Sequence, residues 1–379
     1  MSNWTVAQLK EEIEKLGYQV PSGLRKDDLI LFYVGARVMI EKKIPQIDLK
    51  KVKALSMLCS HTAHAVSDTN AQKCPLPDCL HPTPVKANPE LDWRTHLYTY
   101  GWTIRKIPNF DPKSIREGLL NWLHRTCPGF DPVNPVTWTR DHIPFNLHGI
   151  FKNWVGHLPE LWKTREACHE TFAELWQTPD LLSSYDGFCF LPGGGRSQYK
   201  QWIHCDQGRK VRTFACVQGI VNLFPNEQAD GGTILMSGSH TRFDSYLDNH
   251  PIEGIAGFFP IDPIDLTLKG CQMVKPCLEE GEILLFDSRT FHCNLAPLSI
   301  NPRMCVYVSM MPRSGASQED LAKRQKLYYE GRMTGHWCYG PFFTVCEKEP
   351  REMYTKGTPK PVQLEIAQLN PAQARLAGF

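Results

Sequence analysis

The chain has 379 residues, is 42% hydrophobic and 22% charged, and carries a net charge of only +2. That balance excludes a protein that coats nucleic acid over its whole surface. The chain has no run of 18 or more apolar residues, so no membrane span is predicted. The start, "MSNWTVAQLKEEIEKLG", lacks the pattern of a secretory or transit peptide, so we expect an intracellular protein of the nucleus or cytoplasm. In that setting the 14 cysteines are expected as free thiols.

Residues 1–45 predict a small helical unit. Thr5 and Gln8 have the spacing of a capping box, and a second helix is expected at 24–43. This helix–loop–helix, "TVAQLKEEIEKLG" followed by "PSGLRKDDLI", resembles the SAP motif of DNA- and chromatin-binding proteins. The resemblance implies DNA contact through residues 1–45, with basic side chains on phosphates, namely Arg25, Lys26, Arg37, Lys42 and Lys43. The alternative is a helical hairpin that docks on its own enzyme domain or on a protein partner.

Residues 46–95 read as a linker or irregular segment, because they are rich in Pro, Asn, Thr and Ala. They also hold residues of the types that bind zinc: Cys59, His61, His64, Cys74, Cys79 and His81. Their spacings match no standard pair of two-residue knuckles. An irregular loop with free thiols is therefore favoured, and a zinc site is the alternative.

Residues 96–345 predict one mixed domain. Apolar periodicity indicates helices at 112–126 and 158–179. After residue 183 come short apolar segments broken by Gly, Pro, Asn and Asp, a pattern typical of a jelly roll. The predicted fold class is α+β, with a double-stranded β-helix (jelly-roll, cupin-like) core, flanking helices and the SAP-like unit in front. Residues 346–379 are expected to form a tail that packs on the barrel, with a short helix near 371–377.

Within this domain, the stretch "QWIHCDQGRK" (201–210) places His204 and Asp206 on one face of a strand and Cys205 on the other. A charged pair that faces a barrel interior is costly unless something binds it. His292 follows the buried run "ILLF". We expect a hairpin to bring His292 and Arg303 to neighbouring positions on one sheet face.

Two histidines and one carboxylate form the facial triad of non-haem iron(II) oxygenases, which leaves coordination positions open for a 2-oxo acid and dioxygen. The sequence thus predicts His204, Asp206 and His292 as metal ligands and as the catalytic group. Arg303 is predicted to grip the far carboxylate of the co-substrate through a forked pair. Asn294 shares a face with His292 and is predicted to reach the co-substrate as well.

With these residues in place, region 184–312 resembles the phytanoyl-CoA dioxygenase family of iron(II)- and 2-oxoglutarate-dependent oxygenases. The segment "RTFACVQGIVNLFPNEQADGGTILMSGSH" (212–240) is similar to that family's strand, loop and "NGPLxxxPGSH" turn, with Met236 and Ser237 where the family has its proline. The resemblance implies that 2-oxoglutarate is converted to succinate while a C–H bond is hydroxylated. It implies Fe(II), 2-oxoglutarate and O2, with ascorbate as an accessory reductant. His240, in the "GSH" turn, is expected to be structural.

The substrate is left open by the sequence. The SAP-like unit favours nucleic acid or a chromatin-associated target, and the alternative is a small-molecule or acyl-type hydroxylase. A hypothesis of another class is a non-catalytic DNA- or protein-binding protein on a degenerate oxygenase scaffold. The intact triad and Arg303 favour an enzyme, because a scaffold has no need of them. The loop "TGHWCYG" (334–340) stands out, and no chemistry is predicted for it.

Overall fold

The computed structural model describes residues 5–15, 82–193, 202–250, 257–295, 297–351, 355 and 357–379. The first of these ranges contains α1 (Val6–Lys15). Its capping box is confirmed, because the Thr5 N–H donates to Gln8 Oε1 at 2.8 Å and the Gln8 N–H donates to Thr5 Oγ1 at 3.2 Å. The rest of the SAP-like unit lies outside the described residues, as do the candidate zinc ligands Cys59, His61, His64, Cys74, Cys79 and His81.

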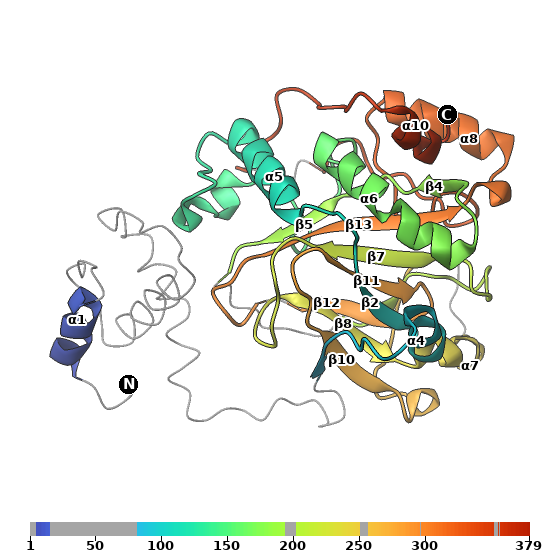
Figure 1. The fold of residues 1–379 in the computed structure, drawn as a ribbon, viewed down its shortest axis with the longest axis horizontal. Helices are drawn as coiled ribbons and strands as arrows, with labels where there is room; N and C mark the ends of the chain where they lie inside the picture. The colour runs from blue at the N-terminus through green and yellow to red at the C-terminus, as the bar shows by residue number, and fades with distance from the viewer. Residues whose placement is uncertain are drawn as a thin grey trace.

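The strands form two sheets (Figure 1). The order of the six-stranded sheet is β1-β10-β8-β12-β6-β9, with bounds Thr83–Val85, Gln272–Pro276, Gly232–Ser237, His292–Leu295, His204–Cys205 and Phe259–Pro260. The seven-stranded sheet has the order β2-β11-β7-β13-β5-β3, with bounds Trp102–Lys106, Glu282–Asp287, Val217–Asn222, Arg303–Pro312, Phe188–Leu191 and Ile150–Phe151. Its remaining strand, β4 (Leu181–Ser183), pairs with β13.

The chain crosses repeatedly between the two sheets, although β8, β9 and β10 follow one another in the six-stranded sheet. From β5 onward, β5, β7, β11 and β13 belong to the seven-stranded sheet, whereas β6, β8, β10 and β12 belong to the six-stranded one. These eight strands pair antiparallel with one another, and β10 also pairs parallel with β1 at the sheet edge. The arrangement is a jelly roll, as the sequence predicted. The inner faces of the sheets pack together through Ile220 and Leu284 from one side and Leu235 and Val274 from the other.

Strand alternation decides what each face of the seven-stranded sheet contacts. On β13, Met304, Val306 and Val308 pack outward in one core cluster with the helices, whereas Cys305 faces the barrel interior. The helices α5 (Pro112–Thr126) and α6 (Pro159–Trp176) cover this outer face (Figure 1). Both helices were predicted from their apolar stripes.

The outer face of the six-stranded sheet packs against α7 (Phe243–Asn249). Ile234 and Phe259 contribute to this cluster, and so do Cys205 and Cys293. Cys205 therefore points away from the barrel interior, as the alternation around "HCD" predicted.

The predicted hairpin between His292 and Arg303 is wrong. His292 opens β12 in the six-stranded sheet, whereas Arg303 opens β13 in the seven-stranded sheet. The reason is that the chain crosses from one sheet to the other between these strands instead of turning back in the same sheet. Arg303 still meets the strand of His292, because it reaches Asn294 across the interior.

The remaining helices frame the barrel: α4 (Trp93–Tyr100), α8 (Gln318–Tyr329), α10 (Pro371–Ala377) and the short 3-10 helices Pro135–Thr137, Arg140–His142, Ser239–Arg242, Leu266–Leu268 and Arg313–Gly315. The predicted C-terminal helix is confirmed as α10, which packs against β4, α6 and α8. Strand β1 lies in the range expected as a linker and pairs with β10. In the described part of the chain, no helix has the length and apolar character needed to cross a membrane.

Candidate metal centre

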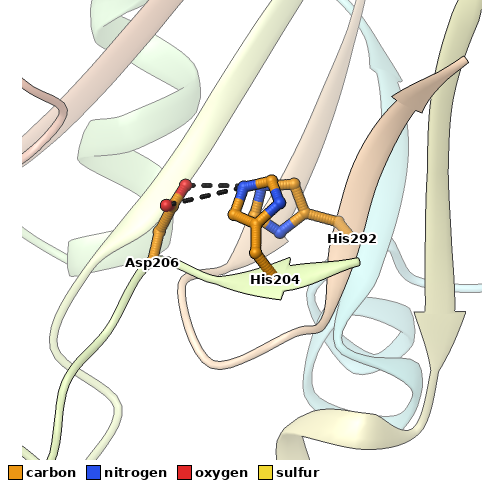
Figure 2. Close-up of side chains that lie close together, drawn as sticks. All are labelled: His204, Asp206 and His292. Atoms are coloured by element: carbon orange, nitrogen blue, oxygen red, sulfur yellow. Dashed lines mark ion pairs between the residues drawn. The ribbon is translucent and has the colours of Figure 1, made fainter. Parts of the chain in front are cut away.

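The two predicted histidine ligands are direct neighbours across the sheet. His204 on β6 pairs with His292 on β12, and their ring centroids lie 4.3 Å apart. Asp206 follows β6 and turns its carboxylate toward both rings (Figure 2). Its oxygens lie 3.6 Å from His204 Nε2 and 3.4 Å from His292 Nε2. The structure therefore gathers one potential ligand atom from each residue, all within 4.8 Å of one another.

Backbone carbonyls fix which nitrogen of each ring faces the centre. His204 Nδ1 lies 3.2 Å from the carbonyl oxygen of Trp202, and His292 Nδ1 lies 3.0 Å from that of Thr290. Because a carbonyl oxygen only accepts, Nδ1 carries the hydrogen and donates it in each ring. The lone pair of Nε2 is then left for a metal, which is how ligating histidines are usually oriented.

The charges of the triad suit a divalent cation. Burial lowers the pKa of His204, and the nearby His292 adds to this effect, so the imidazole is neutral near pH 7. Burial alone would raise the pKa of Asp206, but the neighbouring His204 and His292 hold it well below its usual value. Asp206 is therefore ionised, which is the state in which a carboxylate binds a metal.

Gln218 on β7 fixes the carboxylate and was not singled out from the sequence. Its Nε2 donates to Asp206 Oδ2 at 3.2 Å. A lone glutamine in an apolar strand carries no motif. The available signal was its place on the inward face of β7, two residues before Ile220 and four before Asn222.

Arg303 lies in the barrel interior and is only 3% exposed. Its Nη1 donates to Asn294 Oδ1 at 3.2 Å, and its Nη2 donates to Thr233 Oγ1 at 3.1 Å. Asn294 thus contacts the arginine that was predicted to grip the co-substrate, while its own reach to the co-substrate stays a prediction. Thr233, on the inward face of β8, was not anticipated.

Tyr307 supplies a second polar group near Arg303. Its hydroxyl is buried and has no hydrogen-bond partner among the described residues. Burial raises the pKa of Tyr307, so the hydroxyl keeps its proton and can donate. A buried guanidinium beside an unpaired hydroxyl fits a carboxylate, as two imidazoles and a carboxylate fit iron(II). The residues present therefore suit both the metal and 2-oxoglutarate.

His240 lies apart from this centre. In the "GSH" turn its Nε2 contacts the carbonyl oxygen of Tyr98 at 3.0 Å, which is the structural role expected for it. Within the described residues, the triad is the one group of three or more His, Cys, Asp or Glu placed to hold a metal. The described cysteines are all free thiols, as predicted.

No family model matches the chain. A curated relative from Aspergillus versicolor, the Ava biosynthesis cluster protein O, is 31% identical over 252 residues, which are 62% of this chain and 82% of the relative. A Dictyostelium discoideum protein named "Putative phytanoyl-CoA dioxygenase" is 26% identical over 98 residues, which are 26% of this chain and 28% of that protein.

Among solved structures, the non-haem alpha ketoglutarate dependent carbocyclase SnoK from nogalamycin biosynthesis is similar, with a TM-score of 0.42 and 15% identity, covering 70% of this chain and 100% of SnoK. The epimerase SnoN, solved with Fe3+ and alpha ketoglutarate, gives a TM-score of 0.39 and 13% identity, covering 58% of this chain and 82% of SnoN. The Aspergillus relative shows that the chain belongs to the family of the Ava biosynthesis cluster protein O, and its triad has the ligand types of a non-haem iron(II) centre.

Proposed function

We propose that this enzyme hydroxylates a C–H bond of a small molecule, with iron(II) held by His204, Asp206 and His292 and 2-oxoglutarate held by Arg303. The observation that carries the proposal is the triad itself, with its ligand atoms gathered within 4.8 Å and two Nε2 lone pairs directed at one carboxylate. The curated relative is named for a biosynthesis cluster, which supports a small molecule as substrate. A nucleic-acid target stays a prediction, because most of the SAP-like unit lies outside the described residues.

The protein's own part in the reaction is to hold three ligands in fixed protonation states. When bound, the metal and 2-oxoglutarate supply the oxidising chemistry: O2 and 2-oxoglutarate are consumed, succinate and CO2 are released, and one oxygen atom enters the product as a hydroxyl group. The rings of His204 and His292 present Nε2, because Nδ1 of each ring faces a backbone carbonyl. Asp206 contributes one negative charge, and Gln218 keeps the carboxylate from rotating.

Arg303 is held ready for a carboxylate. Thr233 and Asn294 accept hydrogen bonds from its two terminal nitrogens, which fixes the plane of the guanidinium. A planar, fixed guanidinium binds a carboxylate with less loss of side-chain entropy than a flexible cation does. The unpaired hydroxyl of Tyr307 is a second donor for the same group. Asn294 therefore serves the co-substrate through Arg303 in this proposal.

Apolar side chains keep water from the centre. The ring of Phe286 lies 4.6 Å from that of His292, and Leu235 and Leu284 belong to the core between the sheets. Excluding water strengthens the electrostatic interactions inside the site and protects reactive species from side reactions.

The test is the change His204→Ala in protein prepared without oxygen and loaded with iron(II). The unchanged protein is expected to bind one iron and, once O2 and 2-oxoglutarate are added, to form succinate slowly even without a substrate. The variant should do neither, because one imidazole ligand is gone. A matched control is His169→Ala on α6, whose Nε2 contacts the Pro179 carbonyl. Succinate formation that persists in His204→Ala would sink the proposal, and a wild-type protein without it would favour a non-catalytic scaffold.

A further inference from the structure

The loop 334–340, for which the sequence predicts no chemistry, lies near the metal centre. At its start, the Thr334 N–H donates to the carbonyl oxygen of Tyr185 at 3.2 Å, and its Oγ1 accepts from the Tyr185 N–H at 3.0 Å. Farther on, Trp337 packs in a cluster with Cys216 and the partly buried Val211. The loop is thereby anchored to the β4–β5 connection on one side and to the chain that follows Asp206 on the other.

Within this loop, the side chain of His336 lies within electrostatic reach of Asp206 and His292. Its Nε2 is buried and has no hydrogen-bond partner in the part of the chain that the structure describes. Burial lowers the pKa of His336, and the charges of Asp206, Asp186, Lys152 and His292 act on its ring. Buried polar atoms are nearly always paired, so this nitrogen is a candidate to pair with a bound molecule.

Phe258 is an exposed apolar ring against a metal ligand. It is 49% exposed, and its ring centroid lies 4.9 Å from that of the buried His204. On His204 a second aromatic ring, Trp202, stacks with centroids 4.4 Å apart and an interplanar angle of 3°. A large apolar side chain that is half exposed next to a catalytic centre is typical of a substrate-binding wall.

The segment around Phe258 and the loop that carries His336 are connected by packing. A Cβ added to Gly257 would lie 3.1 Å from Phe342 Cδ1, so the backbone before Phe258 contacts the C-terminal loop closely. Phe342 in turn packs edge-on against Trp337, with centroids 5.0 Å apart. Trp337 is the neighbour of His336. Phe258 and His336 are therefore connected through Phe342 and Trp337, and each lies near the triad: Phe258 against His204, and His336 within electrostatic reach of Asp206.

We propose that Phe258 and His336 are the substrate-contacting residues beside the iron, and that the substrate is a planar apolar molecule with a hydroxyl or carbonyl group. Phe258 packs against the apolar ring system, and His336 Nε2 forms a hydrogen bond with the polar group. A neutral imidazole serves either partner, because each ring nitrogen donates or accepts according to the tautomer. This inference rests on the proposed function, since it places the oxidised carbon beside the triad.

The experiment is calorimetric titration of the full chain, loaded with iron(II) and 2-oxoglutarate without oxygen. The probes are 2-naphthol, which has a ring system and a hydroxyl, and 2-methylnaphthalene, which lacks the hydroxyl. His336→Leu should weaken 2-naphthol binding about tenfold and leave 2-methylnaphthalene unchanged, because only the first probe can use the hydrogen bond. His336→Gln should restore part of the loss. Phe258→Ala should weaken both probes about tenfold.

Control variants replace a remote histidine and a remote exposed aromatic residue. His169→Gln on α6 and Tyr329→Ala on α8, where the side chain is 71% exposed, should leave both affinities unchanged. Equal affinities in wild type, His336→Leu and Phe258→Ala would overturn the inference, and so would a wild-type protein that binds neither probe. Failure of the proposed function would look different: iron uptake and the charge-transfer absorption of the iron(II)–2-oxoglutarate complex would be missing while probe binding remained.

Discussion

The strength of the metal centre depends on single hydrogen bonds around its ligands. Each histidine donates Nδ1–H to a carbonyl oxygen two residues earlier in the chain, Trp202 for His204 and Thr290 for His292. Backbone acceptors cannot be removed by side-chain substitution, so both imidazoles keep their orientation in most variants. The carboxylate is different, because its position depends on a side chain.

Gln218→Leu should weaken iron(II) binding about 10- to 100-fold, because Asp206 loses the donor that orients its Oδ2. The measurement is anaerobic titration of the metal-free protein with iron(II). The matched control is Gln272→Leu, at an exposed glutamine on β10 of the other sheet, which should leave the iron(II) affinity unchanged. An unchanged affinity in Gln218→Leu would show that the two histidines alone hold the carboxylate.

At the scale of elements, His157 ties the start of α6 to the C-terminal part of the chain. Its Nε2 contacts the carbonyl oxygen of Arg332 at 2.9 Å, and its own carbonyl accepts from the Ala367 N–H at 2.9 Å. The ring packs among Trp162, Tyr185 and Tyr328. Because a protonated imidazole is costly in this apolar setting, the packing of α6 is sensitive to acid.

Burial, with a further contribution from Arg165, lowers the pKa of His157 from 6.5 to about 3. Between these values the unfolded chain binds a proton that the folded chain does not, so stability is lost as the pH falls below about 6.5. At pH 5 the loss from this residue should be about 2 kcal/mol. Urea unfolding at neutral pH and at pH 5 measures it.

His157→Gln keeps a donor for the Arg332 carbonyl and removes the titrating ring. It should therefore lose less stability than the wild type between the two pH values, even if it is less stable at neutral pH. His169→Gln, at a histidine of the adjoining helix α6, serves as the control. A wild-type-like pH response in His157→Gln would place the acid sensitivity elsewhere.

What the sequence predicted correctly was local. The helix at 112–126 and the helix at 371–377 follow from caps and apolar spacing within one element, and the face shared by His204 and Asp206 follows from strand alternation. The path from His292 to Arg303 was wrong, because the choice of sheet is made by contacts with strands far away in the chain. Gln218 and Thr233 were missed for the same reason: their partners are distant, and neither residue belongs to a motif.

For the whole molecule, a metal bound at the proposed centre would link distant parts of the chain. His204 and His292 meet only after β6 has paired with β12, so the complete ligand set exists only in the folded state. A ligand that binds the folded state alone raises the free energy of unfolding by about 2.7 kcal/mol at 100 times its dissociation constant.

Adding manganese(II), a redox-stable substitute for iron(II), should raise the melting temperature, and a chelator should reverse the effect. His292→Ala should show no such response, because the cross-strand ligand is missing. Differential scanning calorimetry in both conditions is the measurement. A manganese-dependent shift of equal size in His292→Ala would mean that the stabilising cation binds at another place.

The jelly roll places the metal ligands and the proposed substrate contacts on different parts of its structure. The triad and Arg303 stand on or directly beside strands whose register is held by pairing on both sides. Phe258 and His336 stand on connections that pack against the barrel without belonging to its sheets. Mutations in such connections are tolerated far more often than changes in paired strands. A lineage that carries this fold can therefore exchange what it oxidises many times over while the oxidation itself is passed on unaltered.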